Sequence, residues 1–390
     1  MIENISSYHV VMNSSPSYWE ETESHKIIRT TNRFELREGW QTVYARKPEC
    51  LLVKITLSNG LTGWGEANVP IGPEIVKLII SNIITPLVKK EKFLNPNQMW
   101  QFLYDIQRGR GYHSGYYIDA LAALDIAVWD ALSKFHEIPL GKLLRKKSLT
   151  KIPIYLSGLR QKNLEEKISH LKQWENNGLK GVKLFLPSNN TEIENEISKI
   201  QSKVPEINNW MIDLLWMSEL KSTIKLKKNL EKFNINFLEC PLQPENIEEH
   251  KTLVSKPGVP IALGEHFRTH YQILPWLKEQ ALDVLQPDIG RTGISNALTQ
   301  LKICKKYNIP VTPHMGMGSP IFQAATLHFS SICESNYLQE FQAGLANNLH
   351  ELVKTFWSYK EGYIYMPKKF GLGVEVDEQK ILEYSVNKNL

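Results

Sequence analysis

The chain has 390 residues, enough for two domains or for one large α/β barrel with an additional domain. Hydrophobic residues make up 42% and charged residues 22%, which is typical of globular proteins and excludes a fibrous or disordered chain. A net charge of +5 over this length is too small to indicate a nucleic-acid-binding protein. Because no apolar run could span a bilayer and the first residues lack a secretory signal pattern, we expect a cytoplasmic protein without membrane contacts. The four cysteines lie far apart and predict neither a zinc knuckle nor a disulfide framework.

The first third of the sequence predicts an α+β domain. Leu51–Leu57 and Leu61–Glu66 form two predicted strands joined by a short turn, which is the pattern of a hairpin. Before it, residues Asn13 to Trp40 are polar and aperiodic, so we expect a functional or disordered loop there. A helix is predicted from about Ile118 to Phe135, because its apolar residues recur on one face.

From about Lys151 onward, short apolar strands alternate with amphipathic helices. Parallel neighbouring strands need crossover helices, so this alternation favours a parallel βα barrel over its structural rival, a doubly wound open sheet. The predicted strands are Ile154–Leu156, Gly181–Leu186, Trp210–Leu214, Asn236–Glu239, Pro260–Leu263, Val284–Gln286, Pro310–Thr312 and Tyr337–Gln339.

An acid or a histidine lies at the end of each predicted strand from the third onward, at intervals of 23 to 26 residues. One βα unit has about this length, so the interval is a structural period. A single such residue would be a solvent-facing loop residue, but a series in register predicts a ring at the mouth of the barrel. The series consists of Asp213, Glu239, Glu265, Asp288, His314 and Glu340.

The first three members of this ring indicate a metal site. Asp213, Glu239 and Glu265 lie on consecutive strands, and converging carboxylates repel one another unless a cation neutralises them. Mg²⁺ is the natural candidate because it prefers oxygen ligands. Zinc is disfavoured, since no cysteine or second histidine shares these strand ends.

The next two members predict acid–base chemistry. Asp288 precedes His314 by one unit and can accept the imidazole N–H, which fixes the tautomer and raises the basicity of the other nitrogen. A metal site facing such a pair is equipped to abstract a proton next to a bound carboxylate, with the metal stabilising the resulting enediolate.

The sequence resembles the enolase superfamily and, within it, the mandelate racemase-type subgroup. The resemblance extends from about residue 40 to the C-terminus and implies a modified TIM barrel, (β/α)7β, with an α+β capping domain. It implies a cap at residues 1–150, completed by about 366–390, and a barrel at 151–365. The motifs that carry it, besides the acids of the ring, are Trp64–Ala67 (WGEA), Leu121–Leu132 (LAALDIAVWDAL), Gly181–Phe185 (GVKLF), Gln286–Asp288 (QPD), Pro313–His314 and Phe370–Asp377 (FGLGVEVD).

Residue by residue, the resemblance implies one Mg²⁺ per active site and an acid/base dyad of His314 with Asp288. The Mg²⁺ ligands would be the three acids of the predicted metal site, and Glu340 would hydrogen-bond the substrate carboxylate or the enediolate. Many relatives carry two lysines separated by one residue on the second strand, the second being a base on the opposite face. Here Lys183 is present but Phe185 occupies the second position. This departure disfavours two-base racemisation and favours one-sided chemistry through His314.

Asp213–Ser218 and Gly264–His266 look closest to L-rhamnonate dehydratase-like members. The resemblance therefore implies a hydro-lyase that converts a sugar acid, an aldonate or aldarate, to a 2-keto-3-deoxy acid, with His314 acting first as base and then as acid. His266 and Arg268 are candidate substrate contacts, although a supporting role for His266 and a salt bridge for Arg268 are equally open. Lys183 could likewise contact substrate or be ion-paired at the rim.

Two alternatives stay open at this stage. One is an epimerase or cycloisomerase of a related carboxylate, with Lys183 or a cap residue as second base. The other is a non-catalytic regulator that binds acid sugars, which the complete dyad disfavours because binding alone does not need it. We expect the capping loops, Asn13–Trp40 and Asn68–Gly72, to set the specificity for the small-molecule substrate. Barrels of this kind often assemble, so we expect a homo-oligomer.

Overall fold

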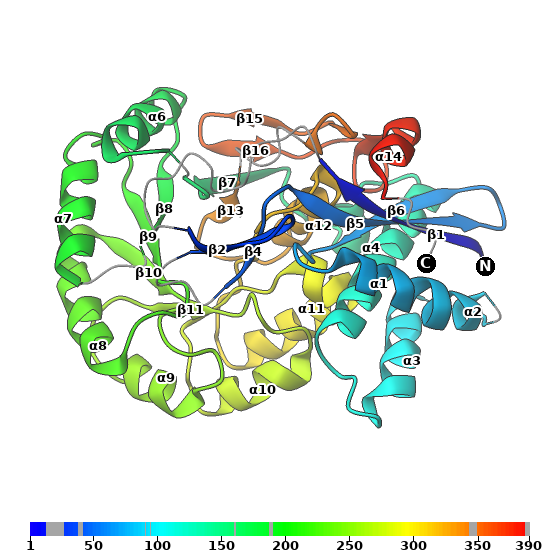
Figure 1. The fold of residues 1–390 in the computed structure, drawn as a ribbon, viewed down its shortest axis with the longest axis horizontal. Coiled ribbons are helices and arrows are strands. Elements are labelled where there is room, and N and C mark those ends of the chain that lie inside the picture. Colours follow the sequence, from blue (N-terminus) through cyan, green and yellow to red (C-terminus); the bar gives the residue numbers. More distant parts are fainter. Residues whose placement is uncertain are drawn as a thin grey trace.

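The computed structural model describes residues 1–12, 27–37, 42–89, 91–93, 95–159, 161–186, 190–342 and 349–386. Figure 1 shows a barrel of strands surrounded by helices, with an α+β cap beside it. The predicted fold, a modified barrel with an α+β capping domain, is confirmed. In the described residues no helix combines the length and the apolar character that crossing a membrane would require.

The cap contains a three-stranded antiparallel sheet in the order β1-β5-β6. The predicted hairpin is confirmed as β5 and β6, which pair from Leu51↔Ala67 to Thr56↔Thr62. The sequence analysis did not predict β1, which pairs with β5 along nearly its whole length. The sheet and the helices that follow it are β1 (Ile2–Val11), β5 (Glu49–Leu57), β6 (Thr62–Ala67), α1 (Pro73–Ile79), the π-helix η1 (Ile80–Ile84), α2 (Thr85–Val88), α3 (Pro96–Arg108), α4 (Tyr116–Phe135) and α5 (Leu140–Leu144).

The predicted loop from Asn13 to Trp40 is partly wrong. Its described part forms β2 (Ile27–Thr30) and β3 (Phe34–Arg37), which pair with each other and with β4 (Tyr44–Ala45). These strands escaped prediction because they are short and β2 is exposed along its length, so no alternation of apolar and polar residues marks them. Residues 13–26 and 38–40 of this stretch lie outside the described residues. In Figure 1, β2 and β4 lie in front of the barrel strands and cross over them.

Helix α4 confirms the predicted helix and packs directly on the cap sheet. Its close approach depends on Gly63 and Gly65 of β6. A Cβ at Gly63 would lie 2.0 Å from the carbonyl oxygen of Ala127, and one at Gly65 would lie 2.0 Å from that of Ala123. Real Cβ atoms do not come this close to backbone, so only glycine permits the helix to lie at this distance from the strand.

Replacing Gly65 by Ala should therefore lower the free energy of unfolding by at least the ~1–3 kcal/mol typical of overpacked cores. Gly109→Ala is the matched control, because its φ is −67° and a Cβ there would have no neighbour within 4 Å. We expect the control to change stability by less than about 0.5 kcal/mol. Chemical denaturation of both variants measures the difference, and equal stabilities would contradict the packing of α4 on β6.

The barrel consists of parallel neighbours in the order β12-β11-β10-β9-β8-β7, with β13 on the other side of β7. The predicted strand Pro310–Thr312 is present only as isolated bridges, Leu285↔Val311 and Asp288↔His314, which continue the circle. The barrel strands are β7 (Lys151–Leu156), β8 (Gly181–Phe185), β9 (Asn209–Asp213), β10 (Ile235–Glu239), β11 (Ile261–Leu263), β12 (Val284–Leu285) and β13 (Gln339–Phe341). The interior is filled by Tyr155, Met211, Phe237, Ala262 and Val284.

The strands form a closed circle, because β7 pairs with both β8 and β13, Val311 bridges to β12, and Thr312 Oγ1 donates to Leu338 O next to β13. The rival open sheet is therefore excluded. The crossover helices lie outside the strands (Figure 1) and bury their apolar faces against them. They are α6 (Leu164–Asn176), α7 (Asn190–Gln201), α8 (Leu220–Asn229) with the short 3₁₀ helix η2 (Leu230–Phe233), α9 (Ile247–Val254), α10 (His270–Lys278), α11 (Ile289–Lys306) and α12 (Pro320–Ser330).

The C-terminal segment returns from the barrel to the cap. Strand β16 adds to β7 in antiparallel orientation, and Val386 N–H donates to His9 O of β1. The elements of this segment are β14 (Val353–Thr355), β15 (Ser358–Lys360), β16 (Tyr363–Tyr365), β17 (Val374–Val376) and α14 (Glu378–Tyr384).

Buried acids fix the cap to the barrel. Glu66 of β6 accepts hydrogen bonds from the backbone N–H groups of Ser319 and Phe322 at the start of α12. Asp125 of α4 accepts from the backbone N–H and the hydroxyl of Ser295 in α11, at 2.8 and 2.5 Å. Two acids of the WGEA and LAALDIAVWDAL motifs thus have a structural role, holding the cap in a fixed position over the barrel mouth.

Candidate active site

His314 and Asp288 form the predicted pair. The bridge between their backbones places them side by side beyond the end of β12. His314 Nδ1 lies 2.8 Å from Asp288 Oδ2, and His314 Nε2 lies 3.0 Å from Glu265 Oε2. Burial alone would lower the pKa of His314, but Glu265, Glu340 and Asp288 together raise it well above its ordinary value. Both ring nitrogens of His314 thus face carboxylates, and these surroundings favour its charged form.

The three acids predicted to hold a metal lie at neighbouring strand ends. Asp213 ends β9, Glu239 ends β10, and Glu265 follows β11 by two residues. Ligand atoms of Asp213, Glu239 and Cys240 all lie within 4.8 Å of one another. The Glu265 carboxylate faces His314 instead, and the charge of His314 lowers the pKa of Glu265 despite its burial.

The backbone turns sharply behind these ligands. Leu215 and Cys240, just after Asp213 and Glu239, have φ values of 49° and 46°, a left-handed conformation that is costly for side chains of this kind. Such strain persists only where the surroundings impose it, and it often accompanies functional sites.

Lys183 lies in the middle of the acids. Its Nζ is 2.6 Å from Glu239 Oε1, 2.8 Å from Glu340 Oε1 and 3.9 Å from Asp213 Oδ2. Burial opposes its charge, but Glu239 and Glu340 raise the pKa of Lys183 well above its ordinary value. Lys183 is thus a protonated, ion-paired side chain in the site, which makes it a poor proton acceptor.

The acids fit a hard divalent cation. Burial, and then the charge of Glu239, raise the pKa of Asp213 to about 8, a sign that negative charge at this point is not fully neutralised. The single positive charge of Lys183 does not neutralise the three carboxylates of Asp213, Glu239 and Glu340. Carboxylate oxygens from neighbouring strands are the donor set that Mg²⁺ prefers.

The affinity for Mg²⁺ should rise with pH up to about pH 8. Below that pH the Asp213 carboxyl holds a proton that Mg²⁺ must displace, since its pKa is raised to about 8. Each unit of pH below this value should lower the apparent affinity by up to about tenfold. Titration calorimetry in two buffers of different ionisation enthalpy measures the affinity and the proton released, and the release should be smaller in Asp213→Asn. A constant affinity between about pH 6 and 8 would contradict this assignment.

The two predicted substrate contacts are placed differently. His266 packs edge-on against Trp216, with ring centroids 4.7 Å apart, and both of its ring nitrogens are buried without a hydrogen-bond partner among the described residues. Burial lowers the pKa of His266 to about 3. Arg268 lines the cavity, but its Nε lies 3.0 Å from Asp119 Oδ1 of α4. Arg268 thus forms the salt bridge that the sequence left open as an alternative. Contact with substrate stays a prediction for both His266 and Arg268.

Three further side chains belong to the site that the sequence analysis did not single out, although Asn68 begins the loop predicted to set the specificity. Asn68, beyond β6, donates from Nδ2 to Asp288 Oδ2 at 2.5 Å. Arg291, half-buried at the start of α11, donates from Nη1 to Glu265 O at 2.9 Å. Asp119 holds Arg268 from the cap. Asn68 could have been found from the sequence, because it directly follows the WGEA motif. No motif or spacing in the sequence pointed to Arg291 or Asp119.

A cavity of about 420 Å³ lies between the cap and the barrel mouth. Its barrel side carries the polar groups described above. Its cap side is formed by residues 42–44 beside β4, residues 68–71 beyond β6, and Gly115, Tyr116 and Asp119 around the start of α4. The predicted specificity loop Asn68–Gly72 thus forms part of the wall. Apolar side chains line the rest, namely Val43, Val69, Ile71, Leu159, Phe185, Leu215, Trp216 and Met317.

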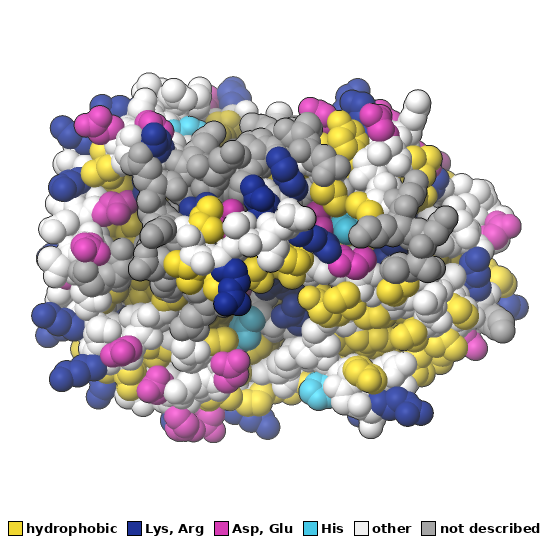
Figure 2. Space-filling view, viewed as in Figure 1, with side chains coloured by type: hydrophobic (Ala, Val, Ile, Leu, Met, Phe, Trp, Pro, Cys, Tyr) yellow, Lys and Arg dark blue, Asp and Glu magenta, His cyan; other side chains and the backbone are white. Residues whose placement is uncertain are grey.

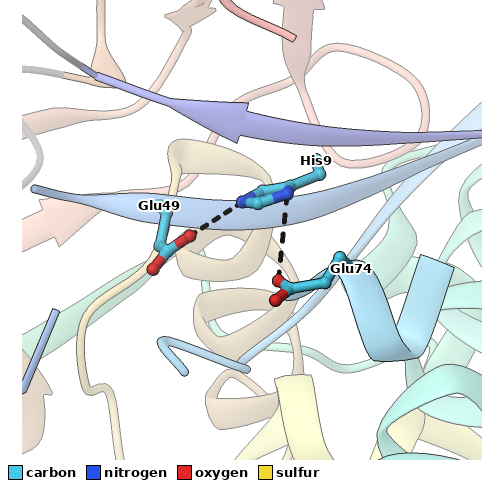
Figure 3. A group of neighbouring side chains, drawn as sticks. All are labelled: His9, Glu49 and Glu74. Atoms are coloured by element: carbon cyan, nitrogen blue, oxygen red, sulfur yellow. Dashed lines mark hydrogen bonds and ion pairs between the residues drawn. The ribbon is translucent and has the colours of Figure 1, made fainter. Parts of the chain in front are cut away.

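A second group of potential metal ligands lies in the cap, where His9, Glu49 and Glu74 converge (Figure 3). His9 Nε2 is 2.7 Å from Glu49 Oε2. The guanidinium of Arg33 already bridges the two acids, with Nη2 2.7 Å from Glu49 Oε2 and Nη1 2.6 Å from Glu74 Oε1. It lowers the pKa of Glu74 to about 2. A side-chain cation therefore occupies this cluster, which ties the turn between β2 and β3 to β5 and α1.

Comparisons with known proteins agree with this geometry. The family model described as "Enolase C-terminal domain-like" matches residues 167–380, and the model "Mandelate racemase / muconate lactonizing enzyme, N-terminal domain" matches residues 36–145. The N-terminal model covers the hairpin and α4 of the cap, and the C-terminal model covers the part of the barrel that follows β7, including its acids.

Solved structures share the whole architecture. A provisionally assigned isomerase from Sinorhizobium meliloti has a TM-score of 0.90 and 26% sequence identity over 98% of each chain. The 3,6-anhydro-D-galactonate cycloisomerase from Zobellia galactanivorans has a TM-score of 0.83 and 23% identity over 99% of each chain. A racemase from Streptomyces coelicolor A3(2) with bound magnesium has a TM-score of 0.84 and 18% identity over 99% of this chain and 100% of that chain. The chain belongs to the enolase superfamily, with N- and C-terminal domains of the mandelate racemase and muconate lactonizing enzyme type.

Proposed function

We propose that this protein is a Mg²⁺-dependent lyase that dehydrates a sugar acid, an aldonate or aldarate, to a 2-keto-3-deoxy acid. One observation carries the proposal: a hydrogen-bonded His–Asp pair faces the acids, while the opposite position holds Phe185 and the ion-paired Lys183. Among the described residues of the site, His314 is therefore the group that we assign to proton exchange at carbon. The resemblance of Asp213–Ser218 and Gly264–His266 to L-rhamnonate dehydratase-like enzymes supports the same reaction class.

The metal would be held by Asp213, Glu239 and Glu265, and bound Mg²⁺ would supply positive charge for the carboxylate of the substrate. Two findings support this assignment, namely the match of the barrel to the enolase family model and the magnesium bound in the racemase structure from Streptomyces coelicolor. Lys183 adds a second positive charge at the same end of the cavity, between Glu239 and Glu340. A carboxylate substrate held at this end of the cavity would present its α-carbon to His314, which lines the same cavity.

His314 Nε2 then takes the proton from the carbon next to the carboxylate. Asp288 Oδ2 accepts a hydrogen bond from His314 Nδ1–H. In this tautomer, Nε2 is the nitrogen with the free electron pair. The C–H electron pair passes into the enediolate. For this step Nε2 must carry no proton, so its 3.0 Å contact with Glu265 Oε2 has to give way to the substrate C–H group.

Protonated His314 then donates to the departing β-hydroxyl. The C–O bond breaks, one water leaves, and the enol tautomerises to the 2-keto-3-deoxy acid. Because one residue serves as base and then as acid, both groups must leave from the same face of the substrate, a syn elimination.

The surface around the cavity suits an anionic substrate. Figure 2 shows Lys and Arg side chains gathered at the centre of the face on which β2 and β4 lie. Arg29 and Arg46 are exposed on and next to these strands. Positive charge around an opening raises the local concentration of anions and speeds their association.

A cycloisomerase or epimerase is the second candidate, and the names of the Zobellia galactanivorans and Streptomyces coelicolor structures favour it. Both share the fold at low identity and both names describe reactions without loss of water. A ring-opening cycloisomerase would use the same α-proton removal, but a ring ether oxygen instead of a hydroxyl would depart.

A screen of diastereomeric aldonates, aldarates and their anhydro derivatives with Mg²⁺ tests the proposal, with keto-acid detection and mass spectrometry as readouts. We expect a keto acid lighter than its substrate by one water. A keto acid of unchanged mass would establish cycloisomerisation, and a hydroxy acid of unchanged mass would establish epimerisation. Tight binding of a sugar acid without turnover would favour a regulator.

A further inference from the structure

We infer that Asn68 of the cap is a positioning residue for the His314–Asp288 pair, an inference that rests on the proposed function. Asn68 is 4% exposed. Its side-chain Nδ2 donates to Asp288 Oδ2 at 2.5 Å, and that oxygen also lies 2.8 Å from His314 Nδ1. The other carboxylate oxygen, Asp288 Oδ1, is buried without a hydrogen-bond partner among the described residues.

These contacts decide how the Asp288 carboxylate is oriented. With only His314 attached, the group could rotate about its Cβ–Cγ bond and exchange the two oxygens. A second donor on the same oxygen fixes the carboxylate plane, and with it the direction in which the imidazole ring points. Catalytic groups need this kind of support, because a small displacement of the base strongly lowers the rate of the reaction that it catalyses.

The backbone around Asn68 is built for this approach. Asn68 N–H donates to Gly290 O at 2.9 Å. A Cβ at Gly290 would lie 2.7 Å from Asn68 Cβ and 2.8 Å from Asn68 N, so glycine is needed at the start of α11. Two residues earlier, Glu66 is bonded to the start of α12. Rigid attachment on both sides therefore brings the end of β6 to the dyad.

The consequence is that the acid–base machinery draws on both domains. His314 and Asp288 belong to the barrel, whereas the group that orients Asp288 comes from the cap. The pair is fully ordered only while the end of β6 is docked between α11 and α12.

A substrate-free measurement tests this inference. In the ¹H spectrum of ¹⁵N-histidine-labelled protein at fixed pH, the Nδ1–H of His314 should give a far-downfield resonance, assigned by its loss in His314→Asn. Asn68→Ala and Asn68→Asp should both shift or broaden it, since neither offers an N–H to Asp288. Ile71→Ala, which alters the same loop and the same cavity wall, should leave it in place. An unchanged resonance in the folded Asn68 variants would overturn the inference, whatever reaction the enzyme catalyses.

Turnover provides the second readout. Asn68→Ala should lower kcat by about tenfold or more. In an Asp288→Asn background the same change should have little further effect, because the group that Asn68 orients has already been altered. Fully additive losses in the two backgrounds would show that Asn68 acts elsewhere and would overturn the inference. Asn68→Asp serves as the second variant where Asn68→Ala folds poorly.

Discussion

Replacing His314 by Asn should lower turnover by at least the ~10²–10⁴-fold that general acid–base catalysis contributes. The loss should lie at the upper end or beyond, because His314 would serve as base in one step and as acid in the next. Asn is nearly isosteric with His and keeps the fold, and the three acids are untouched, so Mg²⁺ and substrate should still bind. Steady-state kinetics together with titration calorimetry separate the two effects.

Two further variants make this test specific. Asp288→Asn should show an intermediate loss, since the imidazole then lacks a fixed tautomer and loses basicity. His136→Asn is the matched control, because His136 is exposed at the end of α4 and should leave kcat unchanged. Equal and modest losses for His314→Asn, Asp288→Asn and a metal-site variant would mean that the ring of polar residues is structural.

Replacing Glu239 by Gln should abolish both Mg²⁺ binding and turnover. The carboxylate is 1% exposed and accepts hydrogen bonds from Lys183 at 2.6 Å and from Gln286 Nε2 at 2.9 Å. The amide removes one anionic ligand and also leaves Lys183 with less charge to balance it. Loss of a residue that only hydrogen-bonds a metal ligand lowers metal affinity by ~10–100-fold. Because Glu239 is itself a proposed ligand, we expect its replacement to lower the affinity by more than this.

Calorimetry with Mg²⁺ alone measures this loss without any substrate. Glu206→Gln is the control, because Glu206 pairs with Lys180 on the surface at 2.9 Å and should not affect the metal. Wild-type Mg²⁺ affinity in Glu239→Gln would contradict the placement of the metal.

The sequence was sufficient to predict the features that depend on periodicity. A βα unit has a nearly constant length, so the interval between Asp213, Glu239 and the acids that follow them marked successive strand ends. The predicted neighbours Asp288 and His314 are in contact for the same reason. Helix α4 was predictable because its apolar face repeats along the chain.

Contacts between the two domains were not predictable in this way. Asn68 and Asp288 are separated by 220 residues, and Arg268 and Asp119 by 149, so no local pattern connects them. The pairing of Glu265 with His314 and the ion pairs of Lys183 depend on side-chain rotamers inside a shared cavity. Strand β2 is exposed along its length, and β3 buries the charged residues Glu35 and Arg37, so neither shows the apolar alternation by which strands are recognised.

The most direct test of the central claim, that His314 removes a proton next to a metal-bound carboxylate, is product analysis in D₂O. The best substrate from the sugar-acid screen is incubated with enzyme and Mg²⁺, and the product is examined by NMR and mass spectrometry. We predict a 2-keto-3-deoxy acid that carries solvent deuterium at the carbon next to the keto group, with far slower product formation by His314→Asn and after chelation of the metal. Equal product formation by wild type and His314→Asn, or by metal-free enzyme, would contradict the account.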